Sequence, residues 1–306
     1  MRCVVTGGAG FIGSNLVDKL VDKGHEVIIF DDLSTGSQYN INPKAKFFKV
    51  DVSNDSSFTT STMGDVLNGV DVVFHMACLA RVQPSIQNPQ WYHDKNVNGL
   101  VNMLEACRQY NIKRFVFSSS SSVYGDVEEK DLPTSEDKEL SPMSPYALHK
   151  LIGEQYCKLY SDLYNIETVC LRYFNVYGER QNTEGAYCLV MGVFAGQMLE
   201  GKPMTINGDG EQRRDFTYVG DVVDANIKCG TINREWKGDV INIGAGDNKS
   251  VNDVANLLGG KRLHRDPVIE PRVTLADNSK AREILEWKPT QDFNSWVIKW
   301  KESLGL

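Results

Sequence analysis

Apolar runs alternate with amphipathic stretches along the first 175 residues of the chain. The apolar runs predict strands at 2–6, 26–30, 46–50, 70–75, 113–118 and 166–172, and the amphipathic stretches predict helices at 11–23, 62–68, 92–110 and 145–164. Such alternation is typical of βαβ units on a parallel sheet with helices on both faces. The sequence therefore predicts an α/β fold built on a doubly wound parallel sheet.

Beyond about residue 175 the pattern loosens into shorter elements, with turn clusters at 207–210 and 244–247. We expect a first domain at 1–175 and a smaller C-terminal α/β lobe at 176–306, some segments of which return to the first domain. Because no Pro/Ser-rich linker separates the parts, they are expected to pack as one unit with a cleft between them. Ligands of open parallel sheets bind at the carboxyl ends of the strands.

A glycine-rich turn follows the first predicted strand. Gly8, Gly10 and Gly13 satisfy the GxGxxG pattern, and Gly7, Gly10 and Gly13 satisfy the wider GxxGxxG variant. Glycine lets the backbone approach a pyrophosphate, and the helix that begins near Phe11 would direct its free amides at the phosphates. Tight packing alone also explains such a turn. We favour a Rossmann-type dinucleotide site, because all its parts occur here in order: a strand, the turn, a helix, a second strand and an acidic residue at the end of that strand.

The terminal acid of that series is Asp31, eighteen residues beyond Gly13. A carboxylate at the end of the second strand accepts hydrogen bonds from the ribose hydroxyls of adenosine, but it repels a 2′-phosphate. The following loop, 32–38, contains no Arg or Lys that could neutralise such a phosphate. The sequence therefore predicts NAD as the cofactor in preference to NADP.

A tyrosine and a lysine lie one helical turn apart in the predicted helix 145–164. Tyr146 and Lys150 are four residues apart and share one face, while Ser144 and Pro145 are suited to the N-cap and the first helical position. The ordinary pKa of tyrosine is about 10, so the phenolate must be stabilised by about 4 kcal/mol before tyrosine can act as a base at neutral pH. The positive charges of Lys150 and of an oxidised nicotinamide would supply that stabilisation. An exposed Tyr/Lys pair on any helix is the alternative, but the preceding dinucleotide motif favours catalysis.

Five consecutive serines, Ser118 to Ser122, follow the strand predicted at 113–118. They could form a flexible loop. A hydroxyl at this place would also reach the substrate oxygen that Tyr146 deprotonates, and hydroxyls both donate and accept hydrogen bonds. The sequence leaves open which serine serves as the relay.

Composition narrows the class of protein. The 306 residues are 41% hydrophobic and 24% charged, as in ordinary globular chains. We expect no membrane span and no secretion signal, hence a cytoplasmic protein, because no apolar run reaches eighteen residues and the chain opens with a strand. The net charge of −7 without a basic stripe argues against nucleic acid as a partner. Seven scattered cysteines without CxxC spacing indicate buried thiols and no metal site.

Further motifs lie at 171–178 (Leu-Arg-Tyr-Phe-Asn-Val-Tyr-Gly), 208–216 and 276–281. Together with the glycine turn and the Tyr-x-x-x-Lys pair, they make the chain resemble the extended short-chain dehydrogenase/reductases of the sugar-nucleotide epimerase/dehydratase family, most of all UDP-hexose 4-epimerases. The resemblance covers nearly the whole length. It implies bound NAD, a nucleotide-sugar substrate with UDP as the expected nucleotide, and a homodimer in which helices 92–110 and 145–164 pair into a four-helix bundle.

The resemblance also implies roles for particular residues. The catalytic residues would be Ser120, Tyr146 and Lys150. The cofactor would be bound by Gly7, Gly10, Phe11, Ile12, Gly13, Asp31, Asp32, Leu33, Ser34, Thr35, Gly36, Asp51, Val52, Met76, Ala77, Cys78, Ala80, Ser118, Tyr146, Lys150, Tyr173 and Val176. The substrate would be bound by Arg81, Ser120, Ser122, Tyr146, Asn175, Ala186, Val190, Arg214, Arg272 and Thr274.

The implied reaction is a transient oxidation at the sugar C4, followed by rotation of the 4-keto sugar and return of the hydride to its opposite face, so that the cofactor is retained. Family dehydratases and decarboxylases carry an acid just before Val-Tyr-Gly, where this chain has Ser121 and Ser122. This departure favours epimerisation over the alternative of a dehydratase or reductase. A non-catalytic NAD sensor is disfavoured because Tyr146 and Lys150 are both present.

Two further positions bear on the substrate. The segment 265–270 departs from the Arg-x-Gly-Asp-like loop with which the family commonly clamps the nucleotide, and Glu270 and Arg272 would serve there in part. Thr274 matches the family position beside the C2 substituent of the sugar, where a small residue is similar to N-acetylhexosamine epimerases. The resemblance thus predicts interconversion of UDP-N-acetylglucosamine and UDP-N-acetylgalactosamine, with UDP-glucose and UDP-galactose tolerated. The alternative is that Thr274 only packs beneath the lobe.

Overall fold

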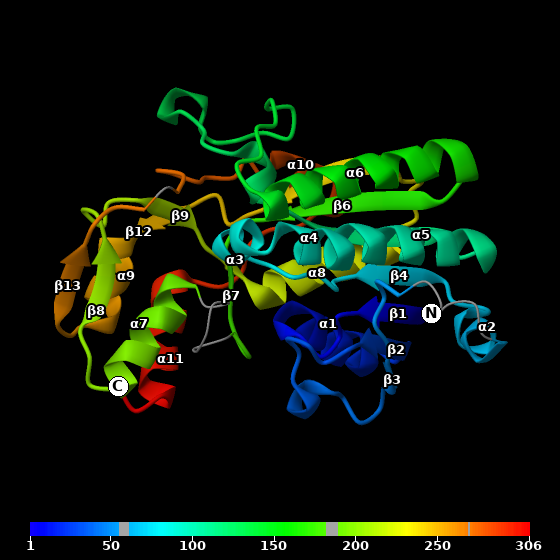
Figure 1. Cartoon of the computed structure of the whole chain (residues 1–306), viewed down its shortest axis with the longest axis horizontal. Coiled ribbons are helices and arrows are strands. Elements are labelled where there is room, and N and C mark those ends of the chain that lie inside the picture. Colours follow the sequence, from blue (N-terminus) through cyan, green and yellow to red (C-terminus); the bar gives the residue numbers. More distant parts are fainter. Residues whose placement is uncertain (55–60, 182–188, 269) are drawn as a thin grey trace.

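A parallel sheet forms the centre of the structure, which is a computed structural model (Figure 1). It describes residues 1–54, 61–181, 189–268 and 270–306, of which 61–63 only as backbone. The strands of the sheet are β1 (Arg2–Thr6), β2 (Glu26–Asp31), β3 (Lys46–Lys49), β4 (Val72–His75), β5 (Arg114–Ser120), β6 (Glu167–Tyr173) and β11 (Lys237–Ile243). Within the described residues their order is β11-β6-β5-β4-β1-β2-β3, and every neighbouring pair is parallel. The predicted α/β fold with a doubly wound parallel sheet is confirmed.

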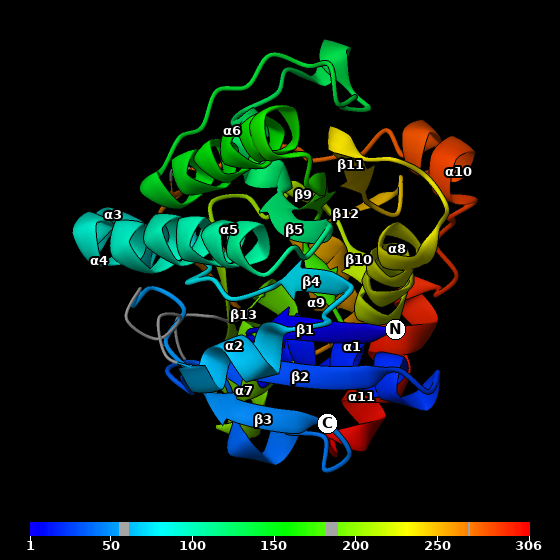
Figure 2. The same ribbon diagram turned by 90° about the vertical axis from the view of Figure 1, so that its right-hand side faces the viewer.

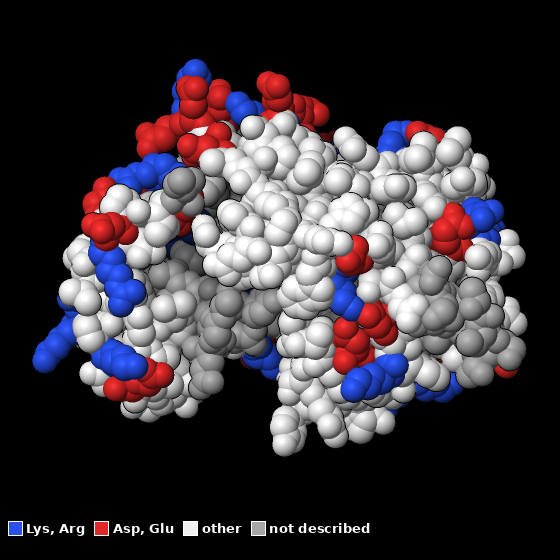
Figure 3. Space-filling view, in the orientation of Figure 1, with Lys and Arg blue, Asp and Glu red and all other residues white. Residues whose placement is uncertain are grey.

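Helices cover both faces of this sheet (Figure 2). They are α1 (Phe11–Asp22), α2 (Ser61–Leu67), α3 (Val82–Gln87), α4 (Pro89–His93), α5 (Gly99–Gln109), α6 (Pro145–Tyr164), α8 (Val219–Thr231) and α10 (Ser279–Leu285). Helices α1, α8 and α10 pack on one face, and α5 and α6 pack on the other. Few charged side chains lie over α5 and α6 on the face that Figure 3 shows.

The C-terminal part contributes to both the sheet and a smaller lobe. Strand β11 extends the main sheet beside β6, and α8 packs on α1. The lobe has its own apolar core and contains β7 (Val176–Tyr177), β8 (Met204–Asn207), β9 (Arg213–Asp215), β10 (Thr217–Tyr218), β12 (Asn248–Ser250), β13 (Arg262–Arg265), α7 (Val190–Leu199), α9 (Val251–Leu258) and α11 (Phe293–Ser303). Three two-stranded sheets pair β7 with β10, β9 with β12 and β8 with β13.

The chain order reverses between β1 and β4, which are neighbours in the sheet. From β1 the chain proceeds outward through β2 and β3, then returns to β4 on the other side of β1. The loops that leave β1 and β4 therefore diverge at their carboxyl ends, which is where open parallel sheets bind ligands. The glycine-rich turn and residues 76–81 lie at this point.

The predicted helix 92–110 is not one regular helix. The structure divides this region into α4, a π-helical turn at Asp94–Asn98 and α5. Within the turn, the Asn96 side chain accepts a hydrogen bond from the Leu79 amide (2.7 Å) and donates one to the Leu79 carbonyl (3.0 Å). A long-range contact therefore accompanies the π turn, and the local apolar pattern does not register it. The other helices and strands predicted in residues 1–175 begin and end within two residues of the observed bounds.

Helix α6 begins as predicted and lies close against β5. The Ser144 hydroxyl accepts from the amide of Ala147 (3.2 Å), and Pro145 is the first helical residue. A Cβ at Gly153 would lie 2.5 Å from the Phe117 ring, so only glycine permits this approach. The next residue, Glu154, forms a buried ion pair with Arg172 of β6 (2.7 Å). Helix α6 is thus held to two adjacent strands.

Glu154→Ala should lower the free energy of unfolding by about 3–5 kcal/mol, because it leaves the buried guanidinium of Arg172 without its partner. Lys158→Ala is the matched control on the same helix, since the Lys158–Asp162 pair is about half exposed (53% and 51%). It should change the free energy of unfolding by no more than about 0.5 kcal/mol. Denaturant unfolding of both variants measures the difference, and equal small losses would contradict the role given to Glu154.

Candidate active site

The glycine turn after β1 is too tightly packed for side chains at Gly7 and Gly13. Gly7 has φ +67°, and a Cβ there would lie 2.8 Å from the Ala77 amide nitrogen. A Cβ at Gly13 would lie 2.1 Å from the Gly7 carbonyl oxygen. Gly10 is the N-cap of α1 and supplies no side-chain cap to its first-turn amides. The turn therefore presents backbone amides and a positive helix end, as a pyrophosphate requires.

Asp31 lies at the end of β2 and is nearly buried, with 7% of its surface exposed. Its carboxylate accepts hydrogen bonds from the amides of Ala9 (2.9 Å) and Leu33 (2.8 Å). Burial raises the pKa of Asp31, and these two hydrogen bonds oppose that shift. Both oxygens are thus held in place at the wall of the pocket, which suits a carboxylate that binds ribose hydroxyls.

One pocket runs from the glycine turn past β2 to the loop after β4. It is lined by these predicted cofactor residues: Gly7, Gly10, Phe11, Ile12, Gly13, Asp31, Asp32, Ser34, Thr35, Asp51, Val52, Met76, Ala77, Cys78, Ala80 and Ser118. Arg81, predicted to bind substrate, also lines it. Leu33, Gly36, Tyr146, Lys150, Tyr173 and Val176 are not among the lining residues. Residues that the sequence did not single out also line the pocket: Ala9, Phe30, Ser37, Asn40, Val50, Leu79, Lys95 and Arg180.

Lys150 is buried beneath the end of β5. Its ammonium donates to the Ser118 carbonyl and lies 5.9 Å from the centroid of the Tyr146 ring. Burial alone would lower the pKa of Lys150, but interactions with Cys78 and Tyr146 outweigh it and raise the pKa. Lys150 is therefore a cation at neutral pH, one turn from the phenol.

Opposing interactions act on the pKa of Tyr146. Burial raises the pKa of the phenol above its ordinary value, whereas Lys150, a hydrogen bond with Ser120 and the charge of Arg81 lower it. The net direction is upward. The side chains of the protein therefore do not by themselves bring the pKa of Tyr146 to neutrality, although each of these three favours the phenolate.

The structure distinguishes the serines of the 118–122 run. Ser119 donates to buried Glu154 (2.5 Å), so its hydroxyl is already engaged. The Ser120 hydroxyl accepts from the Ser122 amide (3.2 Å) and forms the hydrogen bond that lowers the Tyr146 pKa. The Ser122 hydroxyl is buried and has no hydrogen-bond partner within the described part of the chain. Ser120 is thus the serine placed to exchange a proton with Tyr146.

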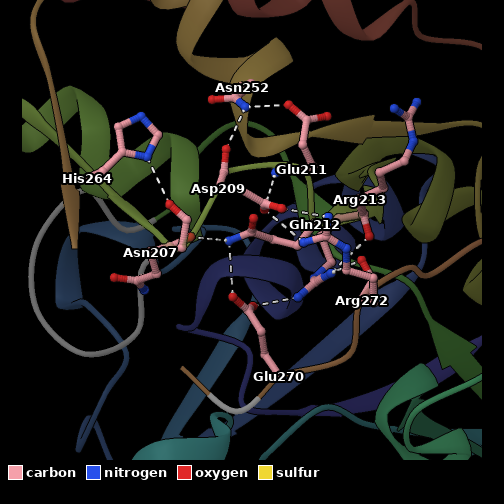
Figure 4. Close-up of polar contacts among 11 residues, drawn as sticks. Asn207, Asp209, Glu211, Gln212, Arg213, Asn252, His264, Glu270 and Arg272 are labelled. Atoms are coloured by element: carbon pink, nitrogen blue, oxygen red, sulfur yellow. Dashed lines mark hydrogen bonds and ion pairs between the residues drawn. The ribbon is translucent and has the colours of Figure 1, made fainter. Parts of the chain in front are cut away.

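Arginines and carboxylates meet in the C-terminal lobe (Figure 4). Arg214 forms an ion pair with Glu270, and the Gln212 side chain also donates to Glu270 (3.2 Å). Arg272 donates to both oxygens of Asp209, each at 2.8 Å. Burial lowers the pKa of Arg214, and the charge of Glu270 opposes that shift. Arg214 and Arg272, both predicted to bind substrate, are thus brought together, each already paired with a carboxylate.

Asn175 and Thr274, both predicted to bind substrate, lie side by side. The Asn175 amide donates to the Thr274 hydroxyl (3.4 Å) and to the carbonyl of Asp215 (3.1 Å). The same hydroxyl accepts from the Asp215 backbone amide (3.2 Å). Val190 is the first residue of α7, whereas the predicted ligand Ala186 lies outside the described residues.

The described ranges offer neither a metal-ligand cluster nor a membrane-spanning helix. No group of three His, Cys, Asp or Glu side chains there could hold a metal ion. No helix in those ranges is long and apolar enough to cross a membrane.

The comparisons with known proteins agree with this geometry. Residues 3–244 match the NAD dependent epimerase/dehydratase family. The chain belongs to this family, and the predictions of an enzyme of this class and of NAD as its cofactor are confirmed.

Particular relatives are similar over almost their whole length. A UDP-glucose 4-epimerase of Mycolicibacterium smegmatis is 35% identical, with 94% of each chain covered. The crystal structure of a UDP-glucose 4-epimerase of Thermotoga maritima with UDP-glucose has a TM-score of 0.91 and 34% identity, covering 99% of this chain and 98% of that one. A UDP-N-acetylglucosamine 4-epimerase of Methanobrevibacter ruminantium, in complex with UDP-N-acetylmuramic acid, has a TM-score of 0.89 and 34% identity, covering 98% and 97%.

Tyr146→Phe should lower turnover about 10²–10⁴-fold while NAD and nucleotide-sugar affinities stay close to those of the parent, because it removes a proton acceptor and little volume. Tyr156→Phe is the matched control, since Tyr156 lies on the same helix and packs against the core. Steady-state rates and calorimetric binding separate the two effects. Turnover of Tyr146→Phe within tenfold of the parent would rule out Tyr146 as the base.

Proposed function

We propose that the protein is a 4-epimerase of UDP-linked sugars that oxidises the C4 hydroxyl, releases no intermediate and reduces the 4-keto sugar from its other face. The observation that carries this proposal is the grouping of Tyr146, Lys150 and Ser120 at the carboxyl edge of β5, beside the dinucleotide pocket. The names of the relatives support the same reaction type and the UDP nucleotide.

Each of these side chains has a definable task. Tyr146 accepts the proton of the sugar 4-hydroxyl on its phenolic oxygen, and Ser120 relays that proton within the hydrogen bond that they share. Lys150 stabilises the phenolate by its charge. Bound NAD supplies the acceptor and donor of the C4 hydride, and its positive ring adds to the field that lowers the Tyr146 pKa. The proton and hydride both return to the sugar, so that no net oxidation occurs.

The alternative of a dehydratase needs an acid in addition to Tyr146, and the described residues at the end of β5 do not supply one. Ser121 and Ser122 occupy the positions where family dehydratases carry a carboxylate. The nearby carboxylate of Glu154 is buried and accepts hydrogen bonds from Nε and Nη2 of its partner Arg172 (2.9 and 2.7 Å) and from the Ser119 hydroxyl. It is therefore unable to protonate a leaving hydroxyl. This arrangement supports epimerisation.

Incubation with a panel of UDP- and dTDP-sugars, followed by separation of the isomers, tests the proposal. An epimerase gives a C4 isomer of equal mass, and NAD is recovered from the denatured protein. A dehydratase gives a product lighter by one water, and a non-catalytic sensor gives no product at all. Either of the last two outcomes would overturn the proposed reaction.

We also infer a division of labour between residues 1–175, which bind NAD, and 176–306, which mainly bind the nucleotide-sugar. Helix α8 and strand β11 return to the first part, because α8 packs on α1 and β11 pairs with β6. Arg214, Arg272 and Thr274 remain in the second part. Substitutions in these three should alter the KM of the sugar nucleotide more than the affinity for NAD, and the reverse outcome would refute the division.

A homodimer through α6 is supported by an exposed apolar stripe. Leu148, Leu159 and Leu163 share one helical face, with exposed fractions of 45%, 46% and 61%. Trp91 of the adjoining α4 is 45% exposed. We propose that a second copy of the chain covers this face, together with the neighbouring α5.

Leu159→Glu should convert the dimer into a monomer, because it buries an unpaired charge in the interface. Ile298→Glu is the matched control, since Ile298 of α11 is equally exposed (45%) but lies in the C-terminal lobe. Sedimentation equilibrium should give twice the chain mass for the parent and for Ile298→Glu. A parent of single-chain mass would contradict the dimer.

Thr274→Tyr tests the proposed preference for N-acetylhexosamines. Overfilling the pocket should cost about 1–3 kcal/mol in kcat/KM, and the loss should fall on the N-acetylated substrates while UDP-glucose and UDP-galactose keep most of their rate. Thr274→Val is the control, because it removes the hydroxyl that accepts from Asn175 and Asp215 without adding bulk. Equal losses on both substrate classes would show that Thr274 does not face the C2 substituent.

A further inference from the structure

A lysine that is distant in sequence lies at the adenosine end of the cofactor pocket. Lys95 donates to the Asp51 carboxylate and to the Ser53 hydroxyl (3.2 Å), and its ammonium nitrogen lies 3.9 Å from the Asp32 carboxylate. Lys95 lines the same pocket as Asp31, Asp32 and Asp51. The loop 32–38 contains no basic residue, yet the fold places a cation against that loop.

The π turn fixes the direction of Lys95. Lys95 is the second residue of Asp94–Asn98, and the next residue, Asn96, is held by the two hydrogen bonds to the Leu79 backbone. Turns of this kind inside helices are frequent at functional sites. With 24% of its side chain exposed, Lys95 is more enclosed than an ordinary surface lysine. Its position beside the pocket is therefore a property of the fold.

The charges at this end of the pocket leave Lys95 neutralised. Burial alone would raise the pKa of Asp51, but hydrogen bonds from Lys95 and Ser53 outweigh it and hold the pKa below its ordinary value. Asp51 is therefore charged at neutral pH. Arg180, another cation that lines the pocket, is paired with Asp18 (2.5 Å). A 2′-phosphate at the adenosine ribose would therefore meet carboxylates there, while Lys95 and Arg180 are both already paired with other carboxylates.

We propose that Lys95 is a specificity-determining residue of the cofactor site, held by Asp51 and Asp32 so that it does not neutralise the 2′-phosphate of NADP. Two carboxylates share one ammonium, so the local charge is negative and opposes a dianionic phosphate. Neutralising Asp32 leaves Lys95 with one partner and frees part of its charge for a phosphate. Discrimination against NADP thus depends on this three-residue arrangement as well as on Asp31.

A double-mutant cycle between Asp32→Asn and Lys95→Met tests the proposal in the full chain after removal of bound nucleotide. The probes are 5′-AMP and 2′,5′-ADP, which differ only by the 2′-phosphate, and their Kd values are measured by calorimetry. Asp32→Asn should improve the preference for 2′,5′-ADP on the order of tenfold, the scale of one charge-assisted hydrogen bond. Asp32→Asn combined with Lys95→Met should lose that gain.

A third variant separates the charge of Lys95 from its packing. Asp32→Asn combined with Lys95→Arg keeps the cation and should keep most of the gain, and thermal unfolding checks that each variant is folded. If the gain persists when Lys95 is replaced by Met, the loss of the Asp32 charge explains it alone and the proposal is wrong. Failure of Asp32→Asn to improve 2′,5′-ADP binding would also overturn it.

Discussion

The buried ion pair between Arg172 and Glu154 is the interaction on which the arrangement of the proposed catalytic side chains depends. It joins α6, which carries Tyr146 and Lys150, to β6, and Ser119 extends the link to β5. Arg172 also donates to the Tyr124 hydroxyl (2.9 Å). Because a buried charge without its partner is strongly unfavourable, helix and strands are constrained to one register. The phenol, the ammonium and the serine-rich strand end are therefore held beside the pocket as one rigid group.

A second constraint is the reversal of chain order between β1 and β4, which leaves room for a dinucleotide at the carboxyl ends of these two strands. In the dinucleotide pocket and in the C-terminal lobe, cations are already paired with carboxylates: Lys95 with Asp51, Arg180 with Asp18, Arg214 with Glu270 and Arg272 with Asp209. An anionic ligand therefore competes with the carboxylates for these cations. Selectivity between similar anions depends on how firmly each carboxylate holds its partner.

The sequence predicted those features that are encoded locally. The strand and helix pattern, the glycine turn, Asp31 and the one-turn spacing of Tyr146 and Lys150 each depend on residues close along the chain. It missed features created by pairing between distant segments. Lys95 of the π turn at 94–98 contacts Asp51, 44 residues earlier in the chain, and Glu270 pairs with Arg214 of β9, 56 residues earlier. No motif signals such pairs, because only the tertiary fold makes them neighbours.

We propose that Tyr146 and its neighbours catalyse a reversible oxidation at C4 in which the same hydride leaves and returns. A UDP-sugar that carries deuterium at C4 tests this directly when it is incubated with the protein in ordinary water and the products are examined by mass spectrometry and NMR. We expect a C4 epimer of unchanged mass with the deuterium still on C4. A product that has lost its deuterium to the medium, or one that is lighter by a molecule of water, would contradict it.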